Sequence, residues 1–131
     1  MLKRIDHIGV VVDDLEAGRR FLESLGFKHS RDLEVPDRGL HASFWQCGDA
    51  SIELLQMDDA GANRERLQGE SRARIEHICL EVDDIARTVD EMGAKGIQFT
   101  SEPSTIGANT SVWSKPETSD GYQLQFMQKG T

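Results

Sequence analysis

A stretch of eleven residues near the start of the chain, RIDHIGVVVDD at Arg4–Asp14, returns seventy positions later as RIEHICLEVDD at Arg74–Asp84. Self-similarity at a fixed period indicates that the chain is built from two similar structural modules. His7 and His77 fall at the same place in the two copies. If the modules pack about a pseudo-twofold axis, the two imidazoles converge on one point, and convergent imidazoles indicate a metal site.

The length of the chain limits how these modules fold. With 131 residues it has the size of one domain, and halves of about 65 residues are each too small to build a strong core alone. We therefore expect a single domain over residues 1–131 with one shared core. Module 1 covers about residues 1–58, a polar linker about 59–73, and module 2 about 74–131.

Charge and hydropathy exclude several classes of partner. A net charge of −8 and a pI near 4.9 leave no broad basic surface to neutralise phosphates, so we expect no nucleic-acid partner. No apolar stretch approaches the roughly 20 residues that span a bilayer, so we expect no membrane partner either.

The start MLKRIDH lacks the apolar region of a signal peptide, which favours a cytoplasmic protein. Cys47 and Cys79 are too few for a disulfide framework and are expected to be reduced core residues.

Module 1 is predicted to have the element order βαβββ. Its first strand, Ile5–Val12, is rich in β-branched residues and ends at Asp13-Asp14, where a helix cap is expected. An apolar helical stripe follows as far as Gly26. The remaining strands are predicted at Phe27–Val35, Leu40–Cys47 and Ser51–Met57.

Module 2 repeats this order. A strand at Ile75–Val82 is followed by Asp84 as a cap and by a helix stripe of Ile85, Val89 and Met92. The later strands are predicted at Ile97–Thr100, Thr110–Ser114 and Tyr122–Gln128, and the linker is predicted to hold a short helix around Asn63–Leu67.

The last strands of the modules match as well. IELLQ at Ile52–Gln56 parallels LQFMQ at Leu124–Gln128, which makes Glu53 and Gln125 equivalent positions. Strand alternation sends each of them away from its apolar neighbours, and a polar group on an inner face requires a partner. With His7 and His77 they form a candidate set of two imidazoles, one carboxylate and one amide oxygen. This set suits one divalent ion such as Co²⁺, Ni²⁺, Zn²⁺, Mn²⁺ or Fe²⁺.

Other polar residues receive structural interpretations. A single buried histidine is usually an ordinary strand residue, and it is the repetition that favours metal ligation here. The pairs Asp13-Asp14 and Asp83-Asp84 resemble catalytic carboxylates, but each precedes a helix stripe, so capping is expected. His29 and His41 have no repeat partner and are expected to be solvated.

Taken together, the paired modules with His7, Glu53, His77 and Gln125 resemble the vicinal oxygen chelate superfamily, over nearly the whole chain. The superfamily includes glyoxalase I, extradiol dioxygenases, bleomycin resistance proteins and methylmalonyl-CoA epimerases. The stretches IEHICLEVDDI and KPETSDGYQLQF are most similar to the epimerases. The resemblance implies an α+β fold in which two tandem βαβββ modules form a pseudo-twofold, half-open β-barrel around a metal site.

The resemblance also implies a reaction. In such enzymes a divalent metal chelates two substrate oxygens and stabilises the enediolate formed when an α-proton is removed, and the proton returns to the other face in an epimerase. The substrate is expected to be a small molecule, an acyl-CoA thioester or another α-acidic carbonyl compound. The epimerases' base-like glutamate on the last strand is Gln125 here, and a second acid/base glutamate aligns with Ala42. Glutamine is no base near neutral pH. In glyoxalase I a metal-bound glutamate can leave the ion and take the substrate proton, and Glu53 occupies the mirror-related position of this chain. The resemblance therefore implies Glu53 as the catalytic residue, both ligand and base.

Three alternatives are compatible with the same residues. A glyoxalase I-like lyase uses a similar metal and base on a hemithioacetal. Two histidines and one carboxylate also describe Fe(II) dioxygenases of the extradiol type. A non-catalytic ligand-binding or resistance protein agrees with the missing glutamates.

Coenzyme A is anionic, and an acidic chain needs a local basic cluster to bind it. The available cations are Arg64, Arg66, Arg72, Arg74 and Lys115, which are interpreted first as a solvated scatter of charges and are left outside the site. Superfamily members commonly form homodimers, and a small sheet with exposed edges has a physical reason to do so, so a homodimer is expected.

Overall fold

The computed structural model describes residues 1–130, and the chain divides into two compact units. One unit runs from His7 to Glu76; the other joins Met1–Asp6 to the residues from His77 onward. The first unit thus contains most of module 1, and the second contains most of module 2. Among residues 1–130, none of the helices has the length and apolar character needed to cross a lipid bilayer.

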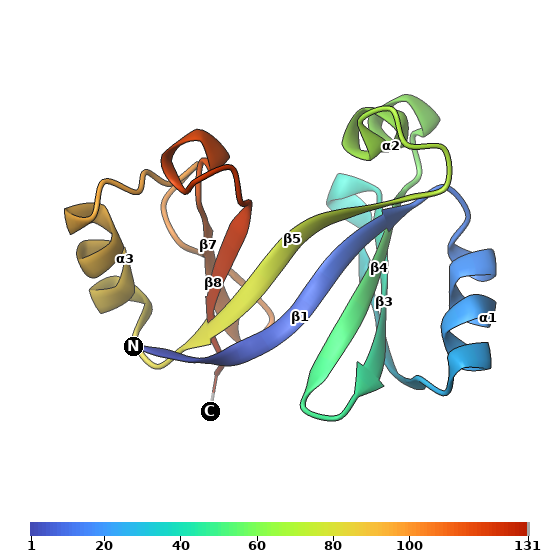
Figure 1. The fold of residues 1–131 in the computed structure, drawn as a ribbon, viewed down its shortest axis with the longest axis horizontal. Coiled ribbons are helices and arrows are strands. Elements are labelled where there is room, and N and C mark those ends of the chain that lie inside the picture. Colours follow the sequence, from blue (N-terminus) through green and yellow to red (C-terminus); the bar gives the residue numbers. More distant parts are fainter. Residues whose placement is uncertain (131) are drawn as a thin grey trace. The chain divides into compact units, whose positions relative to one another are not determined.

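The unit from His7 to Glu76 is a four-stranded half-sheet with two α-helices (Figure 1). Its strand order is β2-β3-β4-β1, with β1 and β4 parallel and the other pairs antiparallel. The elements are β1 (Leu2–Val12, shared with the other unit), α1 (Leu15–Leu25), β2 (Lys28–Val35), a 3₁₀ turn (Pro36–Arg38), β3 (Leu40–Cys47), β4 (Ala50–Met57) and α2 (Ala60–Leu67).

The unit that begins again at His77 has the corresponding order β5-β8-β7-β6, with β5 and β8 parallel. Its elements are β5 (Ala73–Val82, whose first residues belong to the other unit), α3 (Ile85–Ala94), β6 (Ser104–Ile106), β7 (Asn109–Trp113), a 3₁₀ turn (Pro116–Thr118) and β8 (Leu124–Gln128). The α+β class and the two βαβββ modules are therefore confirmed.

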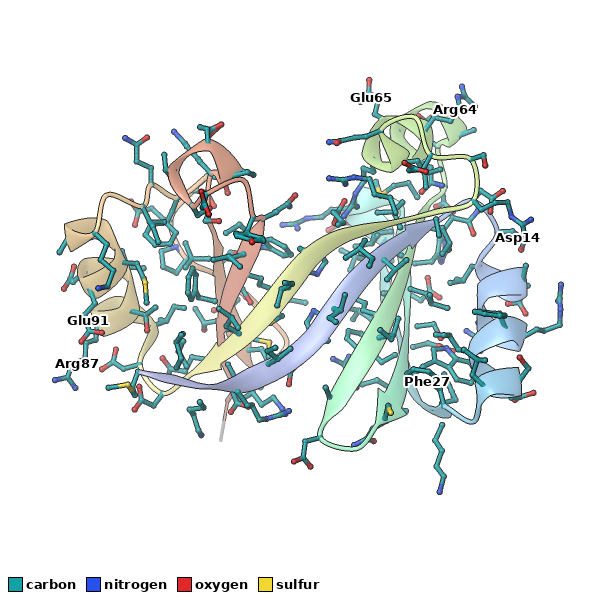
Figure 2. All side chains as sticks on the ribbon, in the orientation of Figure 1. Asp14, Phe27, Arg64, Glu65, Arg87 and Glu91 are labelled. Atoms are coloured by element: carbon teal, nitrogen blue, oxygen red, sulfur yellow. The ribbon has the colours of Figure 1, made fainter. Side chains whose placement is uncertain are left out.

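The helix starts follow the predicted capping. The Asp14 side chain accepts a hydrogen bond from the Ala17 backbone N–H at 3.1 Å, and Asp84 accepts one from Arg87 at 3.0 Å. Figure 2 shows Asp14 beside the first turn of α1. Each cap satisfies a backbone donor that the helix itself leaves without an acceptor. Asp14 and Asp84 are thus structural residues, as expected.

Buried apolar side chains cover both faces of the half-sheet between His7 and Glu76. On one face Val11, Ala42, Phe44 and Leu55 pack with Leu67 of α2; on the other, Val12, Trp45 and Leu54 pack with Leu22 of α1. Strand alternation explains the division, because neighbouring residues of β3 and β4 point to opposite faces. The second unit has its own cluster of Val82, Val112 and Phe126, packed against α3 residues Ile85, Val89 and Met92.

Several element predictions were wrong in detail. Ile97–Thr100 forms no strand and contributes only an isolated bridge between Phe99 and Ser114; the edge strand is β6, which the sequence did not indicate. The α2 helix begins earlier than predicted because Asp59 caps it by accepting from the Ala62 N–H. Cys79 is buried as expected, but Cys47 is exposed at the end of β3.

A polar cluster ties α1 to the half-sheet. Arg19 of α1 donates to Asp32 of β2 at 3.0 Å and to the buried Ser43 of β3 at 3.1 Å, and His29 contacts the same carboxylate at 2.8 Å. Burial raises the pKa of the Asp32 carboxyl, but hydrogen bonds from its neighbours outweigh that effect and lower the pKa from 3.8 to about 2. The ionised carboxylate is therefore the form that stabilises the fold.

The depressed pKa of Asp32 predicts a pH-dependent contribution to stability. It is present above the unfolded pKa near 3.8 and lost as the pH falls through about 2. Asp32→Asn should lower the free energy of unfolding at pH 7 by less than about 1 kcal/mol, because the cluster is partly solvent-screened. Urea titrations measure the free energy of unfolding of both proteins. The difference between Asp32→Asn and the wild type should be smaller at pH 2.5 than at pH 7. An equal difference at both pH values would contradict this assignment, and Asp90→Asn, on an exposed residue of α3, is the control.

Candidate metal centre

The first pair of candidate ligands lies in the unit from His7 to Glu76. Gly9 of β1 is the register partner of Glu53 in β4, and His7, two residues before Gly9, points to the same face. The His7 Nε2 and the Glu53 Oε1 lie 3.2 Å apart. Both residues are buried, with exposed fractions of 4% for His7 and 7% for Glu53. A buried imidazole and a buried carboxylate are thus brought together by one parallel strand pair.

The second pair lies in the other unit. Cys79 of β5 is the register partner of Gln125 in β8, and His77, two residues before Cys79, shares its face. Both His77 and Gln125 are buried. The Gln125 Nε2 donates a hydrogen bond to the Ser111 Oγ of β7 at 3.0 Å. The amide oxygen is the atom of this side chain that has lone pairs to offer a cation.

The two pairs occupy corresponding places in their modules. Gly9 and Cys79 are repeat partners in the sequence, and they pair with Glu53 and Gln125 in the same parallel register. The correspondence continues to the ends of these strands. Gln56 accepts a hydrogen bond from the Leu15 N–H at 2.8 Å, and Gln128 accepts one from the Ile85 N–H at 2.8 Å. Each last strand is therefore fixed to the first turn of its module's helix.

Each histidine also has an aromatic neighbour, which sequence reasoning missed. Phe44 stands edge-to-face to His7, with ring centroids 5.4 Å apart, and Trp113 stands edge-to-face to His77 at 4.7 Å. Phe44 is the register partner of Glu53, and Trp113 is the register partner of Gln125. The rings limit the rotation of the imidazoles. Their distances in sequence from Glu53 and Gln125 differ, so no repeated spacing marked them.

The donor atoms fit a divalent cation of borderline softness. Each unit supplies one imidazole and one oxygen donor in a buried position. A carboxylate accompanies the first imidazole and an amide accompanies the second. Imidazole with carboxylate is the donor combination found around Zn²⁺, Ni²⁺, Mn²⁺ and Fe²⁺. His7 with Glu53 in one unit, and His77 with Gln125 in the other, thus carry donor atoms of the kind that such an ion binds.

One arginine lies within electrostatic reach of Glu53. Arg66 of α2 donates two hydrogen bonds to the buried Glu76, at 2.8 and 2.7 Å, and its Nη1 lies 3.3 Å from the Met57 Sδ. The hydrogen bonds to Glu76 raise the pKa of Arg66, burial opposes this rise, and the charges of Glu76 and Glu53 add to it. The guanidinium therefore stays charged, with Glu76 as its main partner.

The other candidate cations for an anionic substrate are exposed or have contacts of their own. Arg64 is exposed and points away from α2 (Figure 2), and the Arg72 Nε lies 3.9 Å from Asp13. Arg74 donates to the Arg66 backbone carbonyl at 3.1 Å. Lys115 belongs to the other unit. The interpretation as solvated surface charges agrees with the exposed Arg64 and Arg72. It is wrong for Arg66, which forms an ion pair with the buried Glu76.

His29 and His41 are not part of the His7–Glu53 pair. Both are partly exposed, as expected, but each contacts a carboxylate: His29 contacts Asp32, and His41 contacts Glu34 through Nδ1 and Asp58 through Nε2. The hydrogen bond to Asp58 raises the pKa of His41, slight burial lowers it, and the charges of both carboxylates raise it further. The net effect is a pKa above the ordinary 6.5.

The raised pKa of His41 predicts a stabilising contact that is present below pH 6.5 and lost as the pH rises through the folded-state pKa. Asp58→Asn removes the largest cause, so the imidazole pKa should move down toward 6.5. An NMR titration of the His41 ring protons measures it directly. An unchanged titration curve in Asp58→Asn, or an equal shift in the distant Asp90→Asn control, would contradict the assignment.

Comparison with known proteins agrees with this architecture. Residues 6–113 match the family model of the Glyoxalase/Bleomycin resistance protein/Dioxygenase superfamily, so the chain belongs to this superfamily. Human mitochondrial methylmalonyl-CoA epimerase is 33% identical to it over 112 residues, covering 82% of this chain and 62% of the human protein. The chain spans less than two thirds of the length of the mitochondrial epimerases that it matches.

A bacterial relative is matched over more of its length. The ethylmalonyl-CoA/methylmalonyl-CoA epimerase of Cereibacter sphaeroides is 30% identical over 113 residues, covering 83% of this chain and 84% of that protein. Among solved structures, methylmalonyl-CoA epimerase from Mycobacterium tuberculosis has a TM-score of 0.87 at 17% identity, covering 99% of this chain and 90% of that chain. At this identity the structural match establishes the fold.

Proposed function

We propose that this chain, acting as one domain over residues 1–131, is a divalent-metal-dependent epimerase of acyl-CoA thioesters, with methylmalonyl-CoA as the reference substrate. The observation that carries the proposal is the His7–Glu53 pair, a buried imidazole and carboxylate 3.2 Å apart, repeated as His77–Gln125 in the same strand register. The identity of about 30% to the bacterial and mitochondrial epimerases supports the substrate class.

In this proposal His7, His77, Glu53 and Gln125 together hold one divalent cation. A bound cation supplies a Lewis acid that stabilises negative charge as it develops on a substrate carbonyl oxygen. The repeated register gives each module one nitrogen and one oxygen donor. Phe44 and Trp113 keep the two imidazoles oriented.

Glu53 is the proposed proton carrier. Its carboxylate takes the α-proton, so that the substrate C–H bond breaks while an O–H bond forms on Glu53. A water molecule then gives a proton to the opposite face of the carbon, and Glu53 passes its own proton to the resulting hydroxide, which restores the carboxylate and the water. Gln125 and Ala42, at the positions of the epimerases' glutamates in the resemblance, carry no ionisable group. Glu53 is the one carboxylate of the proposed ligand set, and the chemistry therefore rests on it.

The metal proposal predicts one bound ion per chain and dependence on both histidines. His7→Gln and His77→Gln should each weaken binding of Zn²⁺ or Co²⁺ tenfold or more, because each removes one nitrogen donor. Equilibrium dialysis with elemental analysis measures stoichiometry and affinity. His29→Gln should bind like the wild type. Wild-type affinity in either His7→Gln or His77→Gln would contradict a site that uses both units.

The catalytic proposal predicts that Glu53→Gln abolishes turnover while the fold is kept. Loss of a general base lowers the rate by about 10²–10⁴-fold. The assay follows epimerisation of methylmalonyl-CoA by metal-loaded protein, with circular dichroism as the test of folding. Glu23→Gln, on the exposed surface of α1, is the matched control and should retain full activity. Retained activity in metal-loaded Glu53→Gln would reject Glu53 as the base.

We also propose that the protein is cytoplasmic and forms a homodimer. Strands β2 and β6 have one unpaired side each in the two half-sheets, and an exposed strand edge is a ready surface for association with a second copy. Light scattering coupled to size-exclusion chromatography should give twice the chain mass of 14.6 kDa.

A further inference from the structure

A row of side chains crosses the half-sheet between His7 and Glu76 on the face of the His7–Glu53 pair. The register joins Arg31 of β2 to Phe44 of β3, Phe44 to Glu53 of β4, and Glu53 to Gly9 of β1. Register partners in neighbouring strands point to the same face. Arg31 thus lies on the same face as Glu53, two strands away, or roughly 10 Å.

Arg31 is held in this row by two features. Its guanidinium lies over the Phe44 ring, 4.1 Å from the ring centroid, a cation–π arrangement. The same Phe44 ring also stands edge-to-face to His7. In addition, the β2–β3 register shifts between His29 and Arg31, and such a bulge changes the direction of the side chains that follow it.

The guanidinium of Arg31 is available to a ligand. The residue is exposed, and no carboxylate within residues 1–130 forms an ion pair with it. This distinguishes it from Arg19, which pairs with Asp32, and from Arg66, which pairs with Glu76. The planar guanidinium has five N–H groups whose fork matches two oxygens of a carboxylate or phosphate.

Within residues 1–130, the corresponding row of the other unit contains no cationic side chain. It runs from Gln125 of β8 to Trp113 of β7, and the next backbone contact is the Thr100 N–H donating to the Trp113 carbonyl at 2.9 Å. Among the described residues, Arg31 thus extends the row that contains the carboxylate Glu53, and the row that contains Gln125 has no such extension.

We propose that Arg31 is a specificity-determining residue that binds an anionic oxygen group of the substrate whose reacting carbon lies at Glu53. This rests on the proposed epimerase function and names the part of the substrate that the row recognises. The anionic group is either the carboxylate of the acyl moiety or a phosphate of coenzyme A. Phe44 presents the guanidinium and forms the apolar floor between the two ends of the row.

Calorimetric titration of the metal-loaded protein separates these sources. The probes are methylmalonyl-CoA, propionyl-CoA, which lacks the carboxylate, and propionyl-pantetheine, which lacks the phosphates as well. Arg31→Gln should weaken methylmalonyl-CoA binding tenfold or more. If Arg31→Gln loses as much affinity for propionyl-CoA as for methylmalonyl-CoA, and none for propionyl-pantetheine, the group that Arg31 binds is a phosphate. If it loses affinity for methylmalonyl-CoA alone, that group is the carboxylate.

Two further variants exclude trivial causes. Arg20→Gln removes the same charge from the exposed surface of α1, which packs on the opposite face of the half-sheet, and should bind all probes like the wild type. Arg31→Lys keeps the positive charge but lacks the paired N–H groups of the guanidinium, so it should recover part of the affinity that Arg31→Gln loses. If Arg31→Gln fails to fold, Arg31→Lys serves as the test variant.

The outcomes distinguish this inference from the proposed function. If the wild type binds methylmalonyl-CoA but Arg31→Gln binds it equally well, or if Arg20→Gln loses as much affinity, Arg31 only packs on Phe44 and the inference is overturned. If the wild type binds neither CoA thioester, the epimerase proposal fails and this inference with it.

Discussion

The parallel pairing of the first and last strands of each module is the constraint on which the rest of the site depends. The register Gly9–Glu53 and its counterpart Cys79–Gln125 place a histidine and an oxygen donor on one face in both modules. A slip by one residue would turn every side chain of the strand to the other face. Gln56 and Gln128 hold this register by fixing each last strand to the start of the module's helix.

Most of the scaffold could be predicted from the sequence because it is repeated and local. The capping roles of Asp14 and Asp84 and the equivalence of Glu53 with Gln125 follow from spacing along the chain. The features that were missed depend on contacts between distant segments. Phe44 and Trp113 are recognisable only once the strands pair, and β6 is too short and exposed to show a periodic pattern. Cys47 was expected in the core from its apolar strand context, but as the last residue of β3 it is exposed.

The two modules share a scaffold but differ in charge. Glu53 and Arg31 belong to one half-sheet, whereas the corresponding row of the other contains Gln125, Trp113 and the uncharged Thr100. A duplicated chain can keep its packing and caps in both copies while it concentrates proton transfer and substrate recognition in one. Here the packing and the histidines are repeated, whereas the Glu53 carboxylate has the amide of Gln125 as its counterpart.

This account is tested most directly by exchanging the two unequal residues. The measurement is the rate at which deuterium from deuterated buffer replaces the α-proton of methylmalonyl-CoA. This rate is compared between metal-loaded Glu53→Gln and the metal-loaded double variant Glu53→Gln/Gln125→Glu. If the modules are equivalent in geometry and differ only in which one carries the base, the double variant should exchange at least about tenfold faster than Glu53→Gln alone. Exchange in the double variant as slow as in the single variant, with the metal bound in both, would contradict the account.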